Sequence, residues 1–205
     1  MTDTTLATLR AFVAPRVRAE RCELCSLSLP SEHEHVFDPK AARLRCACPA
    51  CALLFSGASG DRPRRIDSFA RRLTALELDD ATWQKLGVPV GLAFFWLRGA
   101  SLDAVASLPG RAGVVESVVP SPLWEALASE HPEVGALSPD VEALLVRRTP
   151  GHRDYFRASI DHCFRLAGLL RSKEGPLSGP EPALVDEFFA ELDTLSGLAS
   201  TRSVA

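Results

Sequence analysis

The sequence has no long run of apolar residues. Its longest, Val88–Leu97, is about half the length that a membrane-spanning helix needs. The segment MTDTTLATLRAF at the start also lacks the basic stretch and apolar core of an export signal, so we expect a cytoplasmic protein with no membrane span. A chain of 205 residues, 46% hydrophobic and 24% charged, excludes wholesale disorder and predicts one domain, or one domain with a small appendage.

Lysine is scarce, because 20 of the 23 basic residues are arginines. The net charge is −3, which disfavours a general nucleic-acid binder, since neutralisation of phosphates dominates that affinity. Residues 1–75 carry 12 basic against 8 acidic residues, so only this part of the chain stays a candidate for binding nucleic acid. Its arginine-rich run over residues 62–72 reads either as a patch for phosphate or an acidic partner, or as an ordinary solvated surface.

Asparagine is absent, and so are the common catalytic signatures. The chain has no dinucleotide-binding glycine pattern, no phosphate-binding loop, no serine-hydrolase elbow and no H-E-x-x-H. His162 beside Cys163 suggests a Cys/His pair, but neighbours on a helix point about 100° apart. We therefore interpret Cys163 as a buried structural thiol and assign no catalytic residue. Asp161 should cap the same helix, and it could also pair with Arg165 four residues on.

Cysteine, by contrast, is concentrated near the N-terminus. Five of the six cysteines lie between residues 22 and 51, and four of these five form two C-x2-C units separated by 22 residues. Stable disulfides are rare in a reducing cytoplasm, whereas two such units can fold as knuckles that place four thiolates around one ion. The predicted metal ligands are Cys22, Cys25, Cys48 and Cys51. Four thiolates suit zinc, or iron in a rubredoxin-like site.

The segment between the two cysteine pairs predicts a β-hairpin, with strands over residues 32–37 and 42–46 and a turn between them. His33 and His35 would share one face of the first strand, since they are two residues apart. Together with Cys46 they are further candidate ligands: they could bind a second ion, or one of them could replace a knuckle cysteine. The alternative interpretation is that both histidines are solvated strand residues and that Cys46 is merely packed.

The overall pattern predicts an α+β fold, in which a small N-terminal zinc-ribbon or treble-clef module is followed by a mixed or antiparallel sheet with flanking helices. We expect an N-terminal helix over residues 1–19, the four-cysteine module over 20–56, a basic linker over 57–75 and an α+β domain over 76–198. Within that domain, Asp79 should cap a short helix, 90–98 should form a buried strand, and Ser121 should cap another helix. The last helix should run from Glu181 to Leu195, with Gly197 closing it.

Several motifs taken together resemble an uncharacterised bacterial, actinobacterial-type family often encoded beside [NiFe]-hydrogenase genes. The motifs are Glu20-Arg21-Cys22-Glu23-Leu24-Cys25, His33-x-His35, Cys46-Ala47-Cys48-x2-Cys51-Ala52-Leu53-Leu54-Phe55, Gly87-Val88-Pro89-Val90-Gly91-Leu92-Ala93-Phe94-Phe95, Asp140-Val141-Glu142-Ala143-Leu144-Leu145-Val146 and Ile160-Asp161-x-Cys163-Phe164-Arg165-Leu166. The resemblance spans roughly residues 18–195. It implies a hydrogenase-linked accessory role and places Asp161, Cys163 and Arg165 in a family motif.

The functional expectation is a zinc-binding, non-enzymatic accessory protein that contacts a protein partner, with a hydrogenase subunit or maturation factor as the candidate. The first alternative is an iron-binding, rubredoxin-like electron-transfer module built on the same four cysteines. The second is an HNH-like metal-dependent nuclease, with His35 as the base and the arginines at 62–72 as phosphate contacts. The absence of asparagine counts against that nuclease, because its motif contains one.

Overall fold

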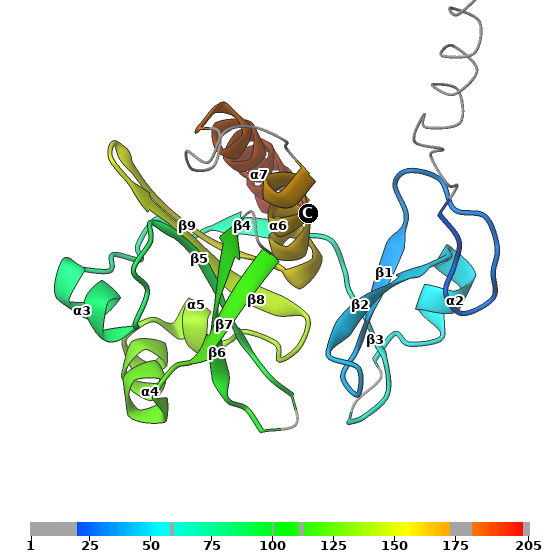
Figure 1. Cartoon of the computed structure of the whole chain (residues 1–205), viewed down its shortest axis with the longest axis horizontal. Helices are drawn as coiled ribbons and strands as arrows, with labels where there is room; N and C mark the ends of the chain where they lie inside the picture. The colour runs from blue at the N-terminus through cyan, green and yellow to red at the C-terminus, as the bar shows by residue number, and fades with distance from the viewer. Residues whose placement is uncertain (1–19, 58–59, 100, 111–112, 173–181, 203–205) are drawn as a thin grey trace, which may run out of the picture.

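The computed structural model describes residues 20–57, 60–99, 101–110, 113–172 and 182–202. The helix predicted over residues 1–19 lies outside this part of the chain. The described residues form two antiparallel sheets with helices, so the predicted α+β class is confirmed. Figure 1 shows the small sheet of β1, β2 and β3 beside the large sheet, which has helices on both of its faces.

The N-terminal module is built on the predicted hairpin. Strand β1 (Glu34–Asp38) pairs with β2 (Arg43–Ala47), and the short strand β3 (Arg64–Arg65) adds to the other edge of β1. The carboxylate of Asp38 accepts hydrogen bonds from the backbone N–H groups of Lys40 and Ala41, which fixes the turn. Helix α2 (Pro49–Leu53) follows β2 directly, so the hairpin leads the chain from the first cysteine pair to the second.

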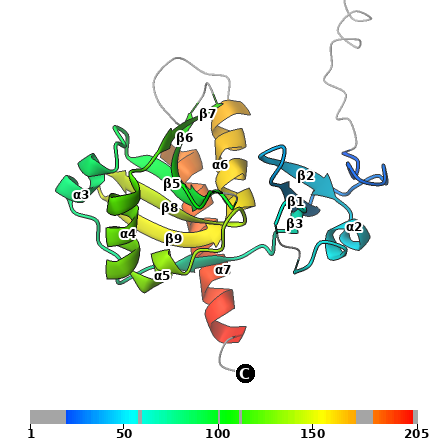
Figure 2. The same ribbon diagram turned by 90° about the horizontal axis from the view of Figure 1, so that it is seen from below.

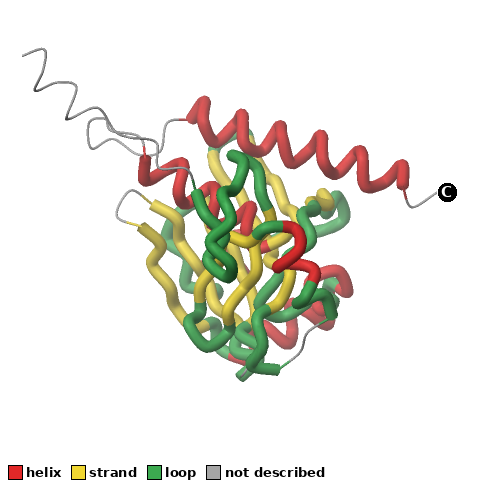
Figure 3. The backbone as a smooth tube through the Cα atoms, turned by 90° about the vertical axis from the view of Figure 1, so that its right-hand side faces the viewer, coloured by secondary structure: helices red, strands yellow, loops and turns green. Residues whose placement is uncertain are grey.

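The large sheet is antiparallel throughout, with strand order β4-β9-β8-β5-β6-β7. Its strands are β4 (Ala70–Arg72), β5 (Leu92–Leu97), β6 (Ala104–Gly110), β7 (Gly113–Val118), β8 (Glu142–Thr149) and β9 (His152–Ser159). One face is covered by α3 (Asp80–Lys85), α4 (Ser121–Glu130) and α5 (Pro132–Gly135). The other is covered by α6 (Ile160–Ser172) and α7 (Pro182–Arg202), and Figure 3 shows α7 as the long helix along this face.

Strand β5 lies in the middle of this sheet and is apolar on both sides, as the sequence predicted, but it covers only 92–97 of the predicted 90–98, and Val90 is exposed. Phe94 and Trp96 face the layer of α6 and α7, whereas Phe95 between them faces α3 and α4. All three side chains are buried, with exposed fractions of 0–2%. A strand covered on both faces needs apolar residues at every position, which explains the continuous run in the sequence.

Of three helix ends predicted from the sequence at Asp79, Ser121 and Gly197, the structure confirms one and differs at two. The carboxylate of Asp79 caps α3 by accepting the backbone N–H of Thr82 at 2.6 Å, as predicted. Ser121 was predicted as a cap but is the first helical residue of α4, with Pro120 at the cap position. Gly197 was predicted to end the last helix, yet α7 continues to Arg202 because Gly197 does not adopt the left-handed conformation that ends a helix.

The segment predicted as a basic linker contributes a strand to each sheet, β3 and β4. Four of its five arginines are held by carboxylates of this chain. The pairs are Arg64 with Asp140, Arg65 with Glu34 and Asp67, Arg71 with Glu133, and Arg72 with Asp154 and Asp193. These four guanidinium groups therefore link separate parts of the fold through ion pairs. Neither interpretation of the arginine-rich run, as a phosphate patch or as a solvated surface, predicted this role.

The N-terminal module packs against the large sheet beside α6 (Figure 2). Phe37 of β1 is 1% exposed and meets the ring of Trp96 edge-on, with 5.8 Å between the centroids. Ile66, directly after β3, is buried in the same apolar cluster. Arg64 of β3 also donates to the backbone carbonyl of Pro139 at 2.9 Å. The two sheets thus share a continuous apolar contact that is reinforced by polar links.

Candidate metal centre

The first cysteine pair lies on a tight loop that the backbone closes. The N–H of Ser26 donates to the carbonyl of Cys22, and the N–H of Cys22 donates to the carbonyl of Leu27, both at 2.8 Å. Ser26 adopts a left-handed conformation with φ of 66°, which lets the chain reverse directly after Cys25. The loop is joined to β2 because the N–H of Glu23 donates to the carbonyl of Cys46. The sequence predicted this knuckle from the C-x2-C spacing alone.

The second cysteine pair lies at the beginning of α2. Cys48 occupies the N-cap position, Pro49 follows as the first helical residue, and Cys51 lies in the first turn. Proline at this position is favoured, because its missing N–H would have no partner in the helix. A knuckle, a hairpin and a second pair at a helix start form the treble-clef arrangement, one of the two alternatives that the sequence left open.

The four sulfur atoms come together as one cluster, within 4.8 Å of one another. The Sγ atoms of Cys25 and Cys48 are 3.7 Å apart. Cys22 and Cys48 are buried, with exposed fractions of 1% and 3%, Cys51 is half-buried and Cys25 is exposed. Four convergent thiols fit a tetrahedral ion with sulfur bonds of about 2.3 Å, and this donor set suits zinc or iron.

Thiols this close together shift one another's pKa values. Burial by itself would raise the pKa of Cys22, but hydrogen bonds from the backbone at Cys48, Leu24 and Cys25 lower it to about 6. The pKa of Cys51 rises to about 12, mainly because its thiol is hydrogen-bonded to the neighbouring Cys48 and Cys25. A thiolate at Cys22 gives a cation a first anionic ligand near neutral pH, since a metal binds the thiolate and not the thiol.

A second cluster lies on the hairpin and consists of His33, His35 and Cys46. One ligand atom from each residue lies within 4.8 Å of the other two. The side chain of His33 is only 5% exposed and that of His35 is 29% exposed, so they are not the solvated strand residues of the alternative interpretation. Burial lowers the pKa of His35, which favours its neutral form. Burial, with help from Glu20 and Glu23, raises the pKa of the Cys46 thiol.

The residues near Cys163 do not form a catalytic pair. Cys163 is completely buried in the apolar cluster under α6, as predicted, and burial raises the pKa of its thiol. The Nε2 of His162 lies instead 3.1 Å from the hydroxyl of Ser68. Arg165 pairs with Glu191 of α7 at 2.8 Å, so the predicted pair with Asp161 is wrong. The tertiary packing of α7 against α6 offers Arg165 this closer carboxylate.

Asp161 has a neighbour that sequence reasoning missed. Its Oδ2 lies 3.9 Å from the Nδ1 of His35, although 125 residues separate the two along the chain. The sequence indicated a place for Asp161 at the start of a helix and a candidate pair with Arg165, but no contact with the N-terminal module. In the structure the Oδ1 of Asp161 accepts the N–H of His162. The contact depends on how the N-terminal module packs against α6, and nothing in the local pattern could have revealed it.

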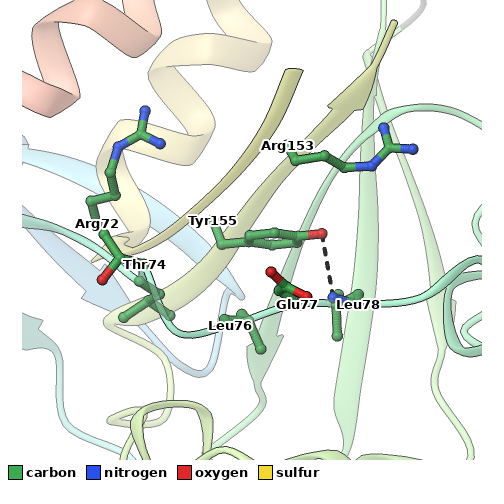
Figure 4. Close-up of a pocket in the computed structure, with 8 residues that line it drawn as sticks. Arg72, Thr74, Leu76, Glu77, Leu78, Arg153 and Tyr155 are labelled. Atoms are coloured by element: carbon green, nitrogen blue, oxygen red, sulfur yellow. Dashed lines mark hydrogen bonds between the residues drawn. The ribbon is translucent and has the colours of Figure 1, made fainter. Parts of the chain in front are cut away.

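A hollow of about 440 Å³ lies between β9 and the chain that follows β4, and none of its lining residues belongs to either cluster. Figure 4 shows Tyr155 between Arg72 and Arg153, with its hydroxyl accepting the backbone N–H of Leu78 at 3.4 Å. Arg72 is already bound to Asp154 and Asp193. The guanidinium of Arg72 is therefore not free to bind a ligand in this hollow. The four-cysteine cluster and the cluster of His33, His35 and Cys46 remain the stronger candidate sites.

Comparison with known proteins yields one match. The family model described as "Family of unknown function (DUF5947)" matches residues 21–196, a range that includes both cysteine clusters. No curated protein and no solved structure matches the chain. Within the described part of the chain, every helix is too short or too polar to cross a membrane.

Proposed function

The chain belongs to this family of unknown function, and we propose that it is a metal-binding accessory protein whose N-terminal module holds one structural zinc ion on Cys22, Cys25, Cys48 and Cys51. The observation that carries the proposal is the convergence of four thiol sulfurs from two separate segments within 4.8 Å. Since protein ligands would fill all four positions, the ion would have no open site for a substrate. Its role would be to stabilise the small module.

The surroundings of the cluster support a structural ion. The apolar residues enclosed by the module are few, namely Cys22, Leu29, Cys48, Val36, Ala47 and Ala52. So small a core stabilises little by itself, and small domains of this kind commonly depend on a metal. All six cysteines are free thiols, which agrees with metal ligation rather than disulfide bonds. Such thiols persist in a reducing compartment, so the proposal places the protein in the cytoplasm.

Metal analysis of the anaerobically purified chain tests this proposal. We expect zinc to be retained and the protein to be colourless, because zinc thiolate sites do not absorb visible light. Cys25→Ser and Cys51→Ser should each lose this ion, whereas the buried Cys163→Ser should keep it as a matched thiol control. A folded wild-type chain that takes up no zinc or iron at this cluster would overturn the proposal.

An iron-binding electron-transfer module is the second candidate. The exposure of Cys25 favours it, because a ligand sulfur near the surface gives electrons a short route to a partner. Iron in the same four thiolates would produce visible absorption bands and a measurable reduction potential. Iron content with such bands would select this candidate over structural zinc, and colourless zinc protein would reject it.

The nuclease alternative has weaker support. Its phosphate contacts would be arginines in residues 62–72, and four of these pair with carboxylates of the same chain. If metal-dependent nicking of plasmid DNA were nevertheless found, His35→Ala should abolish it, because His35 would be the base. Intact plasmid after incubation with metal-loaded wild-type protein would end this alternative.

We also propose that the protein acts by contacting another protein. Exposed apolar side chains support this: Leu27, Leu53 and Leu54 of the N-terminal module are 58–73% exposed, and Val115 and Val118 on the edge strand β7 are 62–64% exposed. Such side chains at a sheet edge favour protein contacts. The resemblance to a family encoded beside [NiFe]-hydrogenase genes makes a hydrogenase subunit or maturation factor the partner to test, by co-purification of the wild type against a Leu53→Glu, Leu54→Glu variant.

A further inference from the structure

We propose that His33, His35 and Cys46 form a second metal site, distinct from the four-cysteine cluster, which binds a divalent transition-metal ion such as Zn²⁺ through three side chains and leaves one coordination position open. The proposal goes beyond the structural zinc ion and does not depend on it. Its starting point is that the three ligand atoms lie within 4.8 Å of one another. Imidazole and thiolate together are a donor set that zinc and its neighbours accept.

The hairpin and the residue just before it bring these three side chains together: β1 begins at Glu34, so His33 directly precedes the strand on which the sequence had placed it. His35 lies directly opposite Cys46 in the register of β1 and β2. His33 precedes His35 by two residues, and the centroids of their rings are 4.8 Å apart. Ala47, the next residue along β2, is buried among Val36 and Ala52 on the other side of the strand. The pairing of the two strands therefore sets His35 beside Cys46, and His33 joins them from the chain just before β1. None of the three is a ligand of the four-cysteine cluster, although Cys46 packs against Cys22 and Cys48.

His33 supplies the second, independent observation. Its side chain is 5% exposed, and its Nε2 is buried with no hydrogen-bond partner in the described part of the chain. Its Nδ1 lies 3.0 Å from the carbonyl oxygen of Pro30, so this nitrogen donates the ring's proton. The lone pair is then left on Nε2. A histidine that donates one nitrogen to a backbone carbonyl and keeps the other free is oriented as metal-ligating histidines are.

His35 is supported from the larger domain. The Oδ2 of Asp161, at the start of α6, lies 3.9 Å from the Nδ1 of His35. A small movement of either side chain would make this a hydrogen bond, which would orient the ring with Nε2 toward the ion and raise its basicity. Asp161 would then be a positioning residue, and the second site would join the hairpin to α6.

The open position follows from the number of ligands. Three protein ligands leave the fourth position of a tetrahedral ion to water or to an exchangeable group. Such an ion would be held less tightly than one enclosed by four thiolates. We therefore infer that this site exchanges its metal, whereas the four-cysteine cluster retains its own.

Counting bound ions tests the proposal. The chelator-stripped full chain is titrated anaerobically with Zn²⁺ and analysed by native mass spectrometry. We expect two ions on the wild type, and one fewer on each of His33→Gln, His35→Gln and Cys46→Ser. His152→Gln is the matched control, because His152 lies on β9 away from both clusters and should keep both ions. Equal ion counts in the wild type and all three variants would overturn the proposal.

Cobalt separates the two sites without relying on any variant. Co²⁺ bound to four thiolates and Co²⁺ bound to two imidazoles and one thiolate differ in their visible absorption, so the wild type should show two successive spectra during titration. A single spectrum of the four-thiolate type at saturation would reject the second site while leaving the structural zinc proposal intact. If only the spectrum of the mixed donor set appears, the second site stands and the four-cysteine proposal fails.

Asp161→Asn tests the positioning role. Removal of such a supporting carboxylate typically weakens metal affinity about 10–100-fold. In Asp161→Asn we expect the affinity of the second site, whose ion Cys46→Ser removes, to fall within this range. The affinity of the four-cysteine cluster, whose ion Cys51→Ser removes, should not change. An unchanged affinity at both sites would show that Asp161 does not orient His35.

Discussion

At the scale of single residues, the chemistry of this protein depends on which thiols can lose a proton. Two cysteines of the four-sulfur cluster have very different pKa values: that of Cys22 is lowered to about 6, and that of Cys51 is raised to about 12. The pKa of Cys25 is also raised: the backbone hydrogen bond at Leu27 and the thiol of Cys51 lower it, but hydrogen bonds with the thiols of Cys22 and Cys48, together with burial, outweigh them. In the metal-bound state all four would be thiolates. Binding must therefore release the protons that remain, including that of Cys51.

The first prediction concerns pH. Metal competes with protons for the thiolates, so zinc affinity should rise with pH and fall as the solution is acidified. Each proton released on binding changes the affinity about tenfold per pH unit, which should be evident between about pH 8 and about pH 6. Competition with a chromophoric chelator measures it. An affinity that does not change with pH would contradict ligation by these thiols.

The second prediction concerns Cys163, which is completely buried and takes no part in either cluster. Cys163→Ser places a hydroxyl in an apolar environment and should lower the free energy of unfolding by about 1–3 kcal/mol. Metal content should stay at the wild-type level. Chemical denaturation and metal analysis of the same preparation check both parts, and a loss of metal in this variant would refute the assignment of Cys163 as a structural thiol.

At the scale of elements, buried ion pairs hold the strands and helices of the large domain together. Arg147 of β8, with a side chain 7% exposed, donates to Asp154 of β9 and to Asp186 of α7, each at 2.6 Å. Its guanidinium also lies 4.3 Å from the centroid of the Phe189 ring. Arg72 of β4 reaches the same Asp154 from the other side. One carboxylate thus connects three strands, and β8 is further tied to α7.

The third prediction is that Arg147→Ala lowers the free energy of unfolding by about 3 kcal/mol, because it removes one partner of a buried ion pair. Arg98→Ala is the matched control, since Arg98 pairs with Glu116 near the surface at 2.9 Å. Exposed pairs of this kind contribute about 0–1 kcal/mol. Urea denaturation of both variants makes the comparison. Equal small losses would show that the Arg147 network is not structural.

At the scale of the whole molecule, the two modules differ in what stabilises them. The large sheet is covered on both faces by helices and has two extensive apolar clusters. The hairpin module encloses few apolar residues of its own, and it rests on the large domain through Phe37, Ile66 and Arg64. Metal loss should therefore affect the smaller module first.

The fourth prediction follows from this difference. Removal of metal by a chelator should expose the backbone of β1 and β2 to hydrogen exchange, while amides of β5 and β8 stay protected. Exchange monitored by mass spectrometry resolves the two regions, and the fluorescence of Trp96, which Phe37 covers, should change as well. Unfolding of the entire chain in one step on chelation would show that the modules are not separately stabilised.

The sequence by itself determined the features that depend on local spacing. The two C-x2-C units indicated the four-sulfur cluster, because knuckles form from neighbouring residues. The hairpin between them and the apolar strand at residues 90–98 followed from strand periodicity and turn residues. The cap at Asp79 followed in the same way, whereas the helix ends at Ser121 and Gly197 did not, since backbone conformation there depends on packing.

Only the tertiary structure decided what lies far apart along the chain. It placed Asp161 beside His35 and paired Arg165 with Glu191 instead of Asp161. It paired four of the five arginines of residues 62–72 with carboxylates of the same chain. It also buried His33 and left its Nε2 without a partner among the described residues, which a two-residue spacing on a strand does not reveal. The physical reason is that such contacts depend on how two sheets pack against each other, and packing is a property of the assembled fold rather than of any local pattern.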